Sequence, residues 1–136
     1  MSDTYAKPLP MPSAESAPYW EYCKRHELRI QRCVSCGDFV HYPRVLCPRD
    51  GTTELEWVKV SGKGNIFSFT ISHRAFHPGF SDDVPYVIAI VELDEGPRMM
   101  CRIRDIEPDD VRVGLLVKVF FEAVTPEVTL PFFRPV

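Results

Sequence analysis

The sequence predicts a mainly β chain that begins with a helical segment, continues through a metal-binding ribbon and ends in a small antiparallel barrel. Three observations support this fold class. Prolines are concentrated near the N-terminus, metal-ligand residues occur in pairs between residues 33 and 50, and short β-prone runs separated by glycine and proline turns fill the rest of the chain. With 136 residues, 45% of them hydrophobic, the chain has the size of one domain or of two small modules that share a core.

Residues 1–28 are predicted to form an extended arm followed by a short amphipathic helix. The prolines of the arm favour extended backbone over a helix or a core strand, so the arm needs another surface to order it. From residue 19 to residue 28, apolar side chains recur at helical spacing behind a proline suited to a first helical turn. The arm and helix are expected to be an interface element with adjacent aromatic residues as anchors for a protein partner, and the alternative is that Trp20 packs beneath the ribbon. These residues are Tyr19, Trp20 and Tyr22.

Residues 29–56 contain too few apolar residues to hold themselves together, which predicts a ribbon stabilised by a metal ion. Two pairs of ligand residues each have a two-residue gap, and a glycine follows each pair. Two ligands on one tight turn can share a tetrahedral ion, and zinc accepts carboxylate oxygen as well as thiolate sulfur. The predicted closed structural zinc site consists of Cys33, Cys36, Cys47 and Asp50. His41 is a competing fourth ligand, and a decayed site with buried thiols is the alternative to bound metal.

Residues 57–136 are predicted to form a five-stranded OB-type barrel and a C-terminal tail. The expected strands are 57–60, 66–73, 86–93, 99–104 and 116–124. Hairpin or bulge turns are expected at Ser61-Gly62-Lys63-Gly64 and at Asp94-Glu95-Gly96-Pro97.

Two connections in the barrel half could bind a ligand. The loop after residue 72 is rich in aromatic and basic side chains that could grip a planar ring and a phosphate, and the alternative is a hydrophobic loop folded over one end of the barrel. The residues in question are Arg74, Phe76, His77 and Phe80. Lys63, between two glycines, could approach a phosphate, although a bulged hairpin is the simpler explanation. Cys23 and Cys101 are interpreted as small core residues.

Composition and charge exclude several classes of protein. The net charge of −3 does not resemble a protein built to wrap nucleic acid, although basic residues dominate from Lys24 to Arg49 and acidic ones from Ser81 to Asp110. An odd number of cysteines, five, favours metal binding in a reducing compartment over a disulfide framework. No apolar run is long enough to span a bilayer, so a cytoplasmic location is expected. The acidic pairs Asp82-Asp83 and Asp109-Asp110 are expected to be solvated.

The motifs together resemble the zinc-ribbon/OB-fold acyl-CoA-associated proteins, a family long catalogued as a domain of unknown function. The resemblance runs from about Tyr19 to Pro135 and depends on the order and spacing of several segments. They are Tyr19-Trp20, residues 28–37 (LRIQRCVSCG), 42–48 (YPRVLCP), 56–64 (EWVKVSGKG), 67–70 (FSFT), 85–89 (PYVIA), 91–96 (VELDEG) and 130–133 (LPFF). The resemblance implies an N-terminal helical segment, a rubredoxin-like zinc ribbon and an OB barrel. This sequence departs from the family pattern at Asp50, where a cysteine is usual.

The resemblance also implies a function. Members are similar in serving as small subunits of thiolase-fold enzymes, with the catalytic cysteine and histidine on the larger partner. The leading hypothesis is therefore an accessory subunit, not catalytic alone, that binds acyl-CoA and a thiolase-fold partner. CoA carries a nucleotide and phosphates, so basic and aromatic residues are its candidate contacts. They are Lys63, Arg74, Phe76, His77, Phe80 and Arg44. The rival hypothesis is a module that binds single-stranded nucleic acid, and a third is a stand-alone hydrolase, for which no motif is found.

Overall fold

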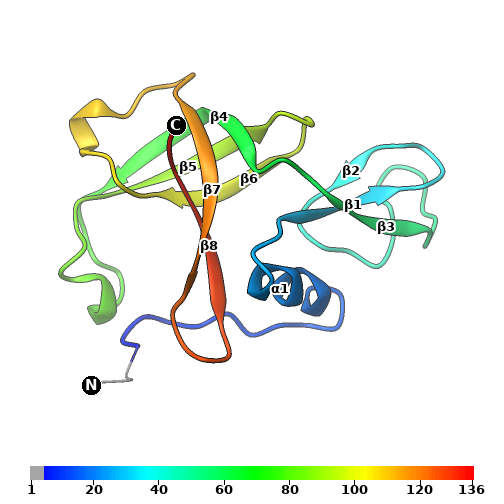
Figure 1. Ribbon diagram of the computed structural model, residues 1–136, viewed down its shortest axis with the longest axis horizontal. Helices are drawn as coiled ribbons and strands as arrows, with labels where there is room; N and C mark the ends of the chain where they lie inside the picture. Colours follow the sequence, from blue (N-terminus) through cyan, green and yellow to red (C-terminus); the bar gives the residue numbers. More distant parts are fainter. Residues whose placement is uncertain (1–4) are drawn as a thin grey trace.

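The computed structural model describes residues 5–136, which form a helix, a three-stranded sheet and a closed five-stranded barrel in that order (Figure 1). Helix α1 spans Ala17–Lys24. The small sheet consists of β1 (Arg29–Cys33), β2 (Phe39–Val40) and β3 (Leu55–Lys59). The barrel strands are β4 (Lys63–Ser72), β5 (Tyr86–Leu93), β6 (Arg98–Ile103), β7 (Leu116–Ala123) and β8 (Thr129–Pro135). Two 3₁₀ turns, η1 (Pro78–Phe80) and η2 (Pro108–Asp110), lie in the connections before β5 and β7.

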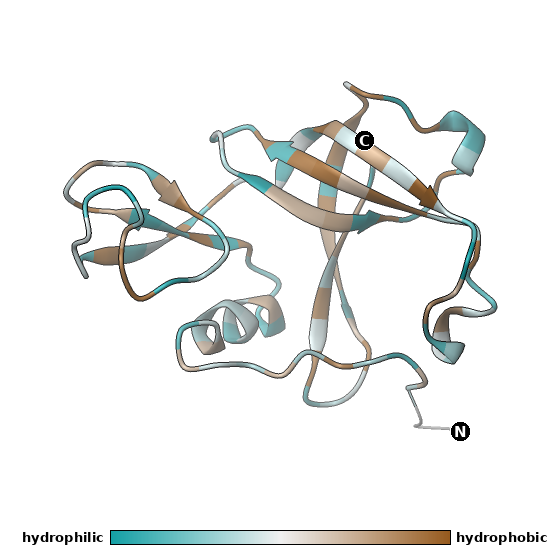
Figure 2. Cartoon of the chain, turned by 180° about the vertical axis from the view of Figure 1, so that it is seen from behind, coloured by the Kyte–Doolittle hydropathy of each residue, from teal (hydrophilic) through white to brown (hydrophobic). Residues whose placement is uncertain are grey.

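The barrel has the strand order β4-β5-β6-β8-β7 and closes where β7 pairs with β4. All its strand pairs are antiparallel except β6 and β8, which pair in parallel at Ile103 and Phe133. Burial alternates strictly along β5, as expected for a strand with one face toward a core. Figure 2 shows the resulting hydrophobic stretches along the barrel strands. This closed five-stranded arrangement is the OB-fold that the sequence predicted.

Helix α1 is shorter at its C-terminal end than the sequence suggested. Its C-cap is Arg25, and the next residue, His26, has a φ of 59° in the left-handed region. The N–H of His26 donates to Cys23 O and that of Glu27 donates to Tyr22 O, which together form a Schellman motif. The helix therefore ends before His26, and this side chain stacks on Phe121 of the barrel instead of extending the helical stripe.

The strand expected at 57–60 belongs to the ribbon and not to the barrel. β3 pairs antiparallel with β1 along its whole length, from Leu55 opposite Cys33 to Lys59 opposite Arg29. The expected boundary between residues 56 and 57 therefore falls inside a ribbon strand. Val60, which follows β3, donates its N–H to Leu28 O, and the barrel begins at β4.

The fifth barrel strand is β8, in the segment expected to be a C-terminal tail. The sequence pattern did not predict this strand, because it contains Pro131 and Pro135 and proline cannot donate to a ladder. β8 pairs with β7 from Thr129 to Pro135 but meets β6 only at Phe133. Because most of the β6-facing edge of β8 carries no ladder, it tolerates proline.

One hydrophobic core joins the three parts of the chain. Buried residues of α1 and β1, including Tyr19, Cys23 and Ile30, belong to the same cluster as the barrel interior around Phe133. A polar contact adds to this, because the N–H of Met100 on β6 donates to the hydroxyl of Tyr42 in the ribbon at 3.2 Å. The ribbon is therefore packed against the barrel and does not hang from a linker.

The turn before β4 is shaped by close backbone contact. A Cβ at Gly64 would lie 2.3 Å from the carbonyl oxygen of Glu92, so only glycine fits between β4 and β5 there. Gly62 has a φ of +78°. Both glycines thus serve the barrel, but the expected bulged hairpin is wrong, because β3 pairs with β1 whereas β4 pairs with β5 and β7. The other expected turn is present, between β5 and β6, with Gly96 at a φ of +114°.

The N-terminal arm lies on the chain's own barrel. Lys7 forms an ion pair with Asp83 at 3.2 Å, and Asp83 also accepts a hydrogen bond from Arg102 at 2.8 Å. Asp83 was expected to be solvated, and that expectation is wrong, because two cations flank it and only 23% of its side chain is exposed. In the part of the chain that the structure describes, no helix is long and apolar enough to cross a membrane.

We predict that Phe133→Ala lowers the free energy of unfolding by about 3–5 kcal/mol, because Phe133 is fully buried where β8 closes the barrel. Chemical denaturation of the folded protein measures this difference. The control is Phe76→Ala, whose side chain is 82% exposed and which should change the free energy by no more than about 0.5 kcal/mol. Equal effects of the two substitutions would contradict this account of the core.

Candidate metal centre

Two similar turns in the ribbon position the candidate ligands. In the first turn, the N–H of Gly37 donates to Cys33 O and the N–H of Cys33 donates to Asp38 O. The second turn repeats both bonds at equivalent positions, from Gly51 to Cys47 O and from Cys47 to Thr52 O. Gly37 and Gly51 have φ angles of 80° and 74°, which glycine adopts at little cost. The spacing recognised in the sequence therefore produces two matching knuckles.

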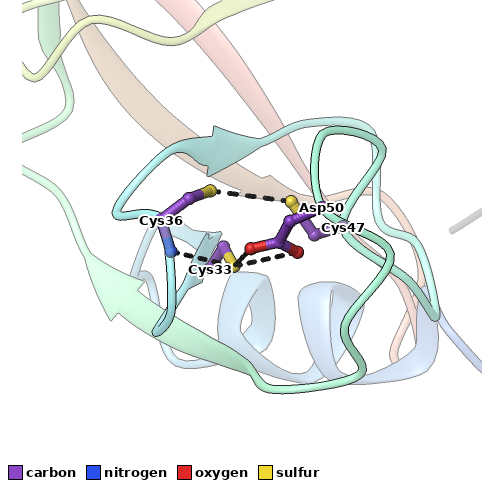
Figure 3. A group of neighbouring side chains, drawn as sticks. All are labelled: Cys33, Cys36, Cys47 and Asp50. Carbon is purple, nitrogen blue, oxygen red and sulfur yellow. Dashed lines mark hydrogen bonds between the residues drawn. The ribbon is translucent and has the colours of Figure 1, made fainter.

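The two knuckles bring four ligand atoms to one point. Figure 3 shows Cys33, Cys36, Cys47 and Asp50 facing one another between the loops. All four ligand atoms lie within 4.8 Å of one another. Cys36 Sγ is 3.7 Å from Cys47 Sγ, and Cys33 Sγ is 3.4 Å from Asp50 Oδ2. These distances define a small cage with three sulfurs and one carboxylate.

The dimensions of this cage fit a tetrahedral zinc ion. Two sulfurs bound to one zinc at about 2.3 Å lie roughly 3.8 Å apart, and a sulfur and an oxygen lie about 3.5 Å apart. The separations of 3.7 Å and 3.4 Å match both values. Four protein ligands leave no open position for water, so the site suits a structural ion and not a catalytic one. Cys33, Cys36, Cys47 and Asp50 are thus positioned to hold zinc, as predicted.

Backbone donors prepare two of the ligands for a cation, whereas the pKa of Cys36 is raised to about 11, because the backbone donor beside it is outweighed by burial and the neighbouring thiols. The N–H of Cys36 donates to Cys33 Sγ at 3.4 Å, and this bond is the main cause of a lowered pKa of the Cys33 thiol. The N–H of Thr52 donates to Asp50 Oδ1 at 3.0 Å and lowers the pKa of that carboxyl. Both groups are therefore biased toward the charged forms that bind metal. Thr52 holds Oδ1, and Oδ2 is the oxygen nearer to Cys33 Sγ, at 3.4 Å against 3.7 Å for Oδ1.

His41 is not the fourth ligand. It lies outside the four-residue group and packs against Tyr19 with ring centroids 5.8 Å apart. Burial lowers the pKa of His41 to about 4, so its imidazole is neutral near pH 7. The alternative ligand considered from the sequence is thus wrong, and the residue serves the packing between helix and ribbon.

The two remaining cysteines are unreactive thiols. Cys23 is fully buried on α1, and burial raises its pKa to about 12. Cys101 on β6 donates from Sγ to Pro131 O at 3.3 Å, and burial also raises its pKa to about 12. A thiol is nucleophilic as the thiolate, which is scarce near pH 7 at such values. Both residues behave as the small core hydrophobes that the sequence predicted.

The six candidate CoA contacts are not brought into one site. Lys63 stands at the start of the ten-residue strand β4, whereas the loop with Arg74 and Phe76 follows its end. Arg44 lies in the ribbon, where its backbone is bonded to the side chain of Gln31. Arg74 and Phe76 remain close together at an exposed loop tip, with the guanidinium 5.4 Å from the ring centroid.

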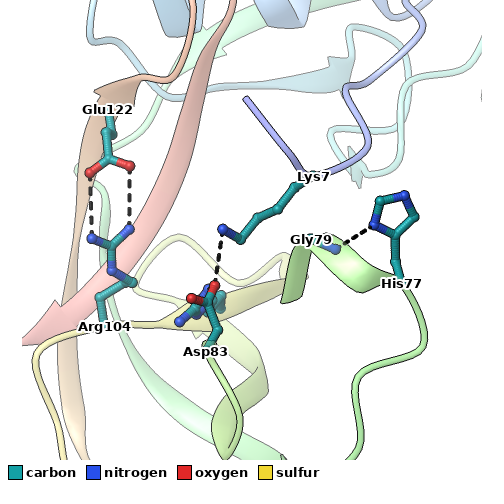
Figure 4. Close-up of polar contacts among 7 residues, drawn as sticks. Lys7, His77, Gly79, Asp83, Arg104 and Glu122 are labelled. Carbon is teal, nitrogen blue, oxygen red and sulfur yellow. Dashed lines mark hydrogen bonds and ion pairs between the residues drawn. The ribbon is translucent and has the colours of Figure 1, made fainter. Parts of the chain in front are cut away.

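The other two members of that loop have structural roles. His77 accepts a hydrogen bond from Gly79 N at 2.9 Å and thereby caps η1 (Figure 4). Phe80 stacks on Tyr86 with centroids 5.5 Å apart. These contacts support the alternative in which part of the loop folds over the barrel.

The predicted interface aromatics are partly used within the chain. Tyr19 is buried in the core at 6% exposure, so it is not free to meet a partner. Trp20 is half-buried and meets Tyr19 edge-on, with ring centroids 5.1 Å apart. Tyr22 is half-buried between Trp57 and the guanidinium of Arg29. Of the three, Trp20 and Tyr22 retain surface for a partner.

Sequence patterns did not reveal two cavities under the arm. Their volumes are about 550 Å³ and 460 Å³, and both are lined by residues of β6 and β8. The shared lining residues are Met100, Cys101, Arg102, Leu130 and Phe132. In the sequence, each of these residues has the pattern of an ordinary strand residue. The cavities form only when β6, β8 and the arm come together in the fold.

Comparison with known proteins identifies the family. Residues 20–56 match the family described as "ChsH2, rubredoxin-like zinc ribbon domain", and residues 57–122 match "ChsH2, C-terminal OB-fold domain". A DUF35 domain-containing scaffold protein of Methanocaldococcus jannaschii is 38% identical over 107 residues, which are 77% of this chain and 75% of that protein. This chain belongs to the DUF35 family. The resemblance drawn from the motifs is thereby confirmed.

Other matches cover nearly the whole chain. A solved structure named "Ltp2-ChsH2(DUF35) aldolase" superposes with a TM-score of 0.85 at 36% identity and covers 93% of this chain and 98% of that one. A probable enoyl-CoA hydratase alpha subunit of Thermomonospora curvata is 36% identical over 129 residues, or 95% of this chain. This DUF35 chain spans only 40% of the length of that subunit.

We predict that Cys36→Ser abolishes stoichiometric zinc binding and loosens the ribbon while the barrel stays folded, because the metal site supplies the folding free energy of this small sheet. Metal analysis and amide exchange of β1 to β3 measure the two effects. Val34→Ala, a neighbouring exposed residue that is not a ligand, is the matched control. Absence of zinc from carefully prepared wild-type protein would contradict the assignment.

Proposed function

We propose that this DUF35 chain is an accessory subunit that binds a larger enzyme subunit acting on acyl-CoA thioesters and helps to bind the acyl-CoA. The observation that carries the proposal is the set of relatives, which are named a hydratase alpha subunit, a scaffold protein and an aldolase component. The partner expected from the family resemblance has a thiolase fold. Carbon–carbon bond formation or cleavage would then take place on that partner.

The chemistry of the chain supports a non-catalytic role. The metal cage has no open position, and the two isolated cysteines are protonated near pH 7. His41 is buried and neutral, and His77 is engaged in capping η1. Among the described residues, these cysteines and histidines therefore provide no activated nucleophile with a base beside it.

The exposed tip of the loop before β5 is our candidate for contact with CoA. Arg74 offers a guanidinium for phosphate, and Phe76, 82% exposed, offers a ring that can stack on adenine. Lys63 and Arg44 would reach the same ligand only if it extended along the barrel or if the partner completed the site. Trp20 and Tyr22 are the candidate partner contacts that keep some exposed surface.

We predict that the isolated chain releases no thiol from acetoacetyl-CoA or a long-chain acyl-CoA above the buffer rate. The reason is the absence of an activated nucleophile, and a colorimetric thiol assay measures it. Cys101→Ser should leave this result unchanged. Robust turnover that disappears in Cys101→Ser or His77→Ala would overturn the accessory role.

We predict that the chain, tagged and recovered from its native cells, retains a larger enzyme of acyl-CoA metabolism identified by mass spectrometry. Trp20→Ala should reduce that recovery severalfold, because aromatic anchors cost about 2 kcal/mol or more when truncated. Val113→Ala, an exposed apolar residue on the barrel, is the control.

A titration of the purified chain with acyl-CoA and with single-stranded DNA separates the two binding hypotheses. Saturable binding of DNA without binding of acyl-CoA, and with no acyl-CoA enzyme recovered, would favour the nucleic-acid module over the accessory subunit.

A further inference from the structure

The N-terminal arm crosses the barrel beside β8 and reaches α1 on the far side (Figure 1). Three of the arm residues between 5 and 12 are prolines, which have no N–H to donate. Among the described residues, the first backbone hydrogen bond near the arm joins Ala17 N to Ser13 O, at the start of the helix. The segment from residue 5 to residue 12 is therefore attached by side chains and by shape, and not by strand pairing.

Lys7 is the main polar attachment. Its ammonium lies 3.2 Å from Asp83 Oδ2 (Figure 4). It also lies over the rings of Tyr5 and Phe80, at 5.6 Å and 5.5 Å from their centroids. Only 22% of the Lys7 side chain is exposed, an unusual degree of burial for a lysine. Asp83 keeps Arg102 as a second partner, so it remains paired when Lys7 leaves.

Gly79 provides the second attachment. A Cβ at this position would lie 2.3 Å from Ala6 O and 2.9 Å from Lys7 N, so the arm passes directly over the η1 turn where a side chain would stand. The φ of Gly79 is not in the left-handed region, so the local turn alone does not demand glycine. The arm is what requires a glycine here.

The two cavities under the arm form one depression that the arm divides. Tyr5, Lys7 and Pro8 line the smaller cavity, and the next part of the arm, from Pro10 onward, lines the larger one. The β6 and β8 residues Met100 and Phe132 line both. The residues that line both cavities are mainly apolar but include Arg102, whose buried Nε has no hydrogen-bond partner. The smaller cavity is also lined by the charged residues Asp83, Arg104 and Glu122.

We propose that residues 5–12 are a removable strap that occupies a groove between β6 and β8, with Lys7 and Gly79 as its two points of attachment. When the strap leaves, the two cavities become one continuous groove that accepts an extended, proline-containing segment with a lysine positioned to meet Asp83. A ligand or partner segment that needs the whole groove must first displace the strap. Its apparent affinity therefore falls in proportion to the fraction of chains that are open.

The strap can be removed without unfolding the chain. In the described part of the chain, every residue of the hydrophobic core cluster, and every residue packed against it, lies at or after Tyr19. The inference does not depend on the identity of an enzyme partner, so it can fail while the proposed function stands.

The first test measures backbone motion of the full chain by ¹⁵N heteronuclear NOE. In the wild type, the arm residues Ala6, Lys7 and Leu9 should have values close to those of the barrel strands. Lys7→Glu and Gly79→Ala should each lower these values to those of a free terminus while the barrel resonances stay in place. Lys24→Glu and Ser81→Ala are the matched controls and should have no effect. Unchanged arm values in both strap variants, or a free arm in the wild type, would overturn the proposal.

The second test supplies the strap in trans. A fluorescent peptide of residues 5–12 should bind saturably to a chain that begins at Ser13, and should bind the full chain far less because its own arm occupies the groove. The Lys7→Glu peptide should bind roughly twofold to fivefold more weakly, the range expected for loss of one partly exposed ion pair. Absence of binding to the shortened chain, or equal binding of the two peptides, would overturn the proposal.

Discussion

The four-ligand centre of the ribbon is the constraint on which the first half of the structure depends. β1 to β3 and the loops between them bury few large side chains, and two of the deepest residues of this region, Cys33 and Cys47, are ligands. The two knuckles place those ligands only when both loops keep their paired turns. A surface ion pair between Arg49 and Asp38, at 2.9 Å, links the two loops and is too exposed to replace the metal. A metal ion bound by these four residues would therefore join the two knuckles.

Asp50 makes this centre asymmetric. Cys33 and Cys47 are buried, whereas Asp50 is exposed and also accepts a bond from Thr52. An oxygen ligand at the solvent side is harder and more hydrated than the thiolate it replaces, so it contributes less to holding a borderline-soft ion. The bond from Thr52 N to Oδ1 offsets part of this difference, because it holds the carboxylate beside Cys33 Sγ. A hydrogen bond from outside the ligand set thus helps to orient one ligand.

Local patterns were enough to predict most of the fold. Three of the metal ligands follow from spacing, because each knuckle is a short segment whose geometry is set by its own turn, whereas the choice between Asp50 and His41 needed the structure. β5 and the turn at Gly96 follow from a run of β-prone residues between turns and from turn chemistry. The failures concern pairing: β3 has a strand pattern that fits either sheet, and only its partner β1 assigns it to the ribbon. β8 was hidden by Pro131, which is tolerated because that edge is largely unpaired.

The binding surfaces were harder to predict because they are formed by contacts between segments far apart in the sequence. Asp83 resembles a solvated turn residue until Lys7 and Arg102 are placed beside it. The prolines of the arm correctly indicated an extended segment that needs a surface. They do not indicate whether that surface belongs to the chain's own barrel or to a partner protein. The same properties, missing N–H donors and exposed apolar side chains, suit the arm to its own barrel and to a partner equally. The structure places the arm on the barrel. The absence of a side chain at Gly79 leaves space for Ala6, and the turn itself does not require a glycine there. The arm is held in its groove by one partly exposed ion pair, so its binding and its release both involve a small free-energy change. The groove is therefore open or occupied according to whether a competing segment is present.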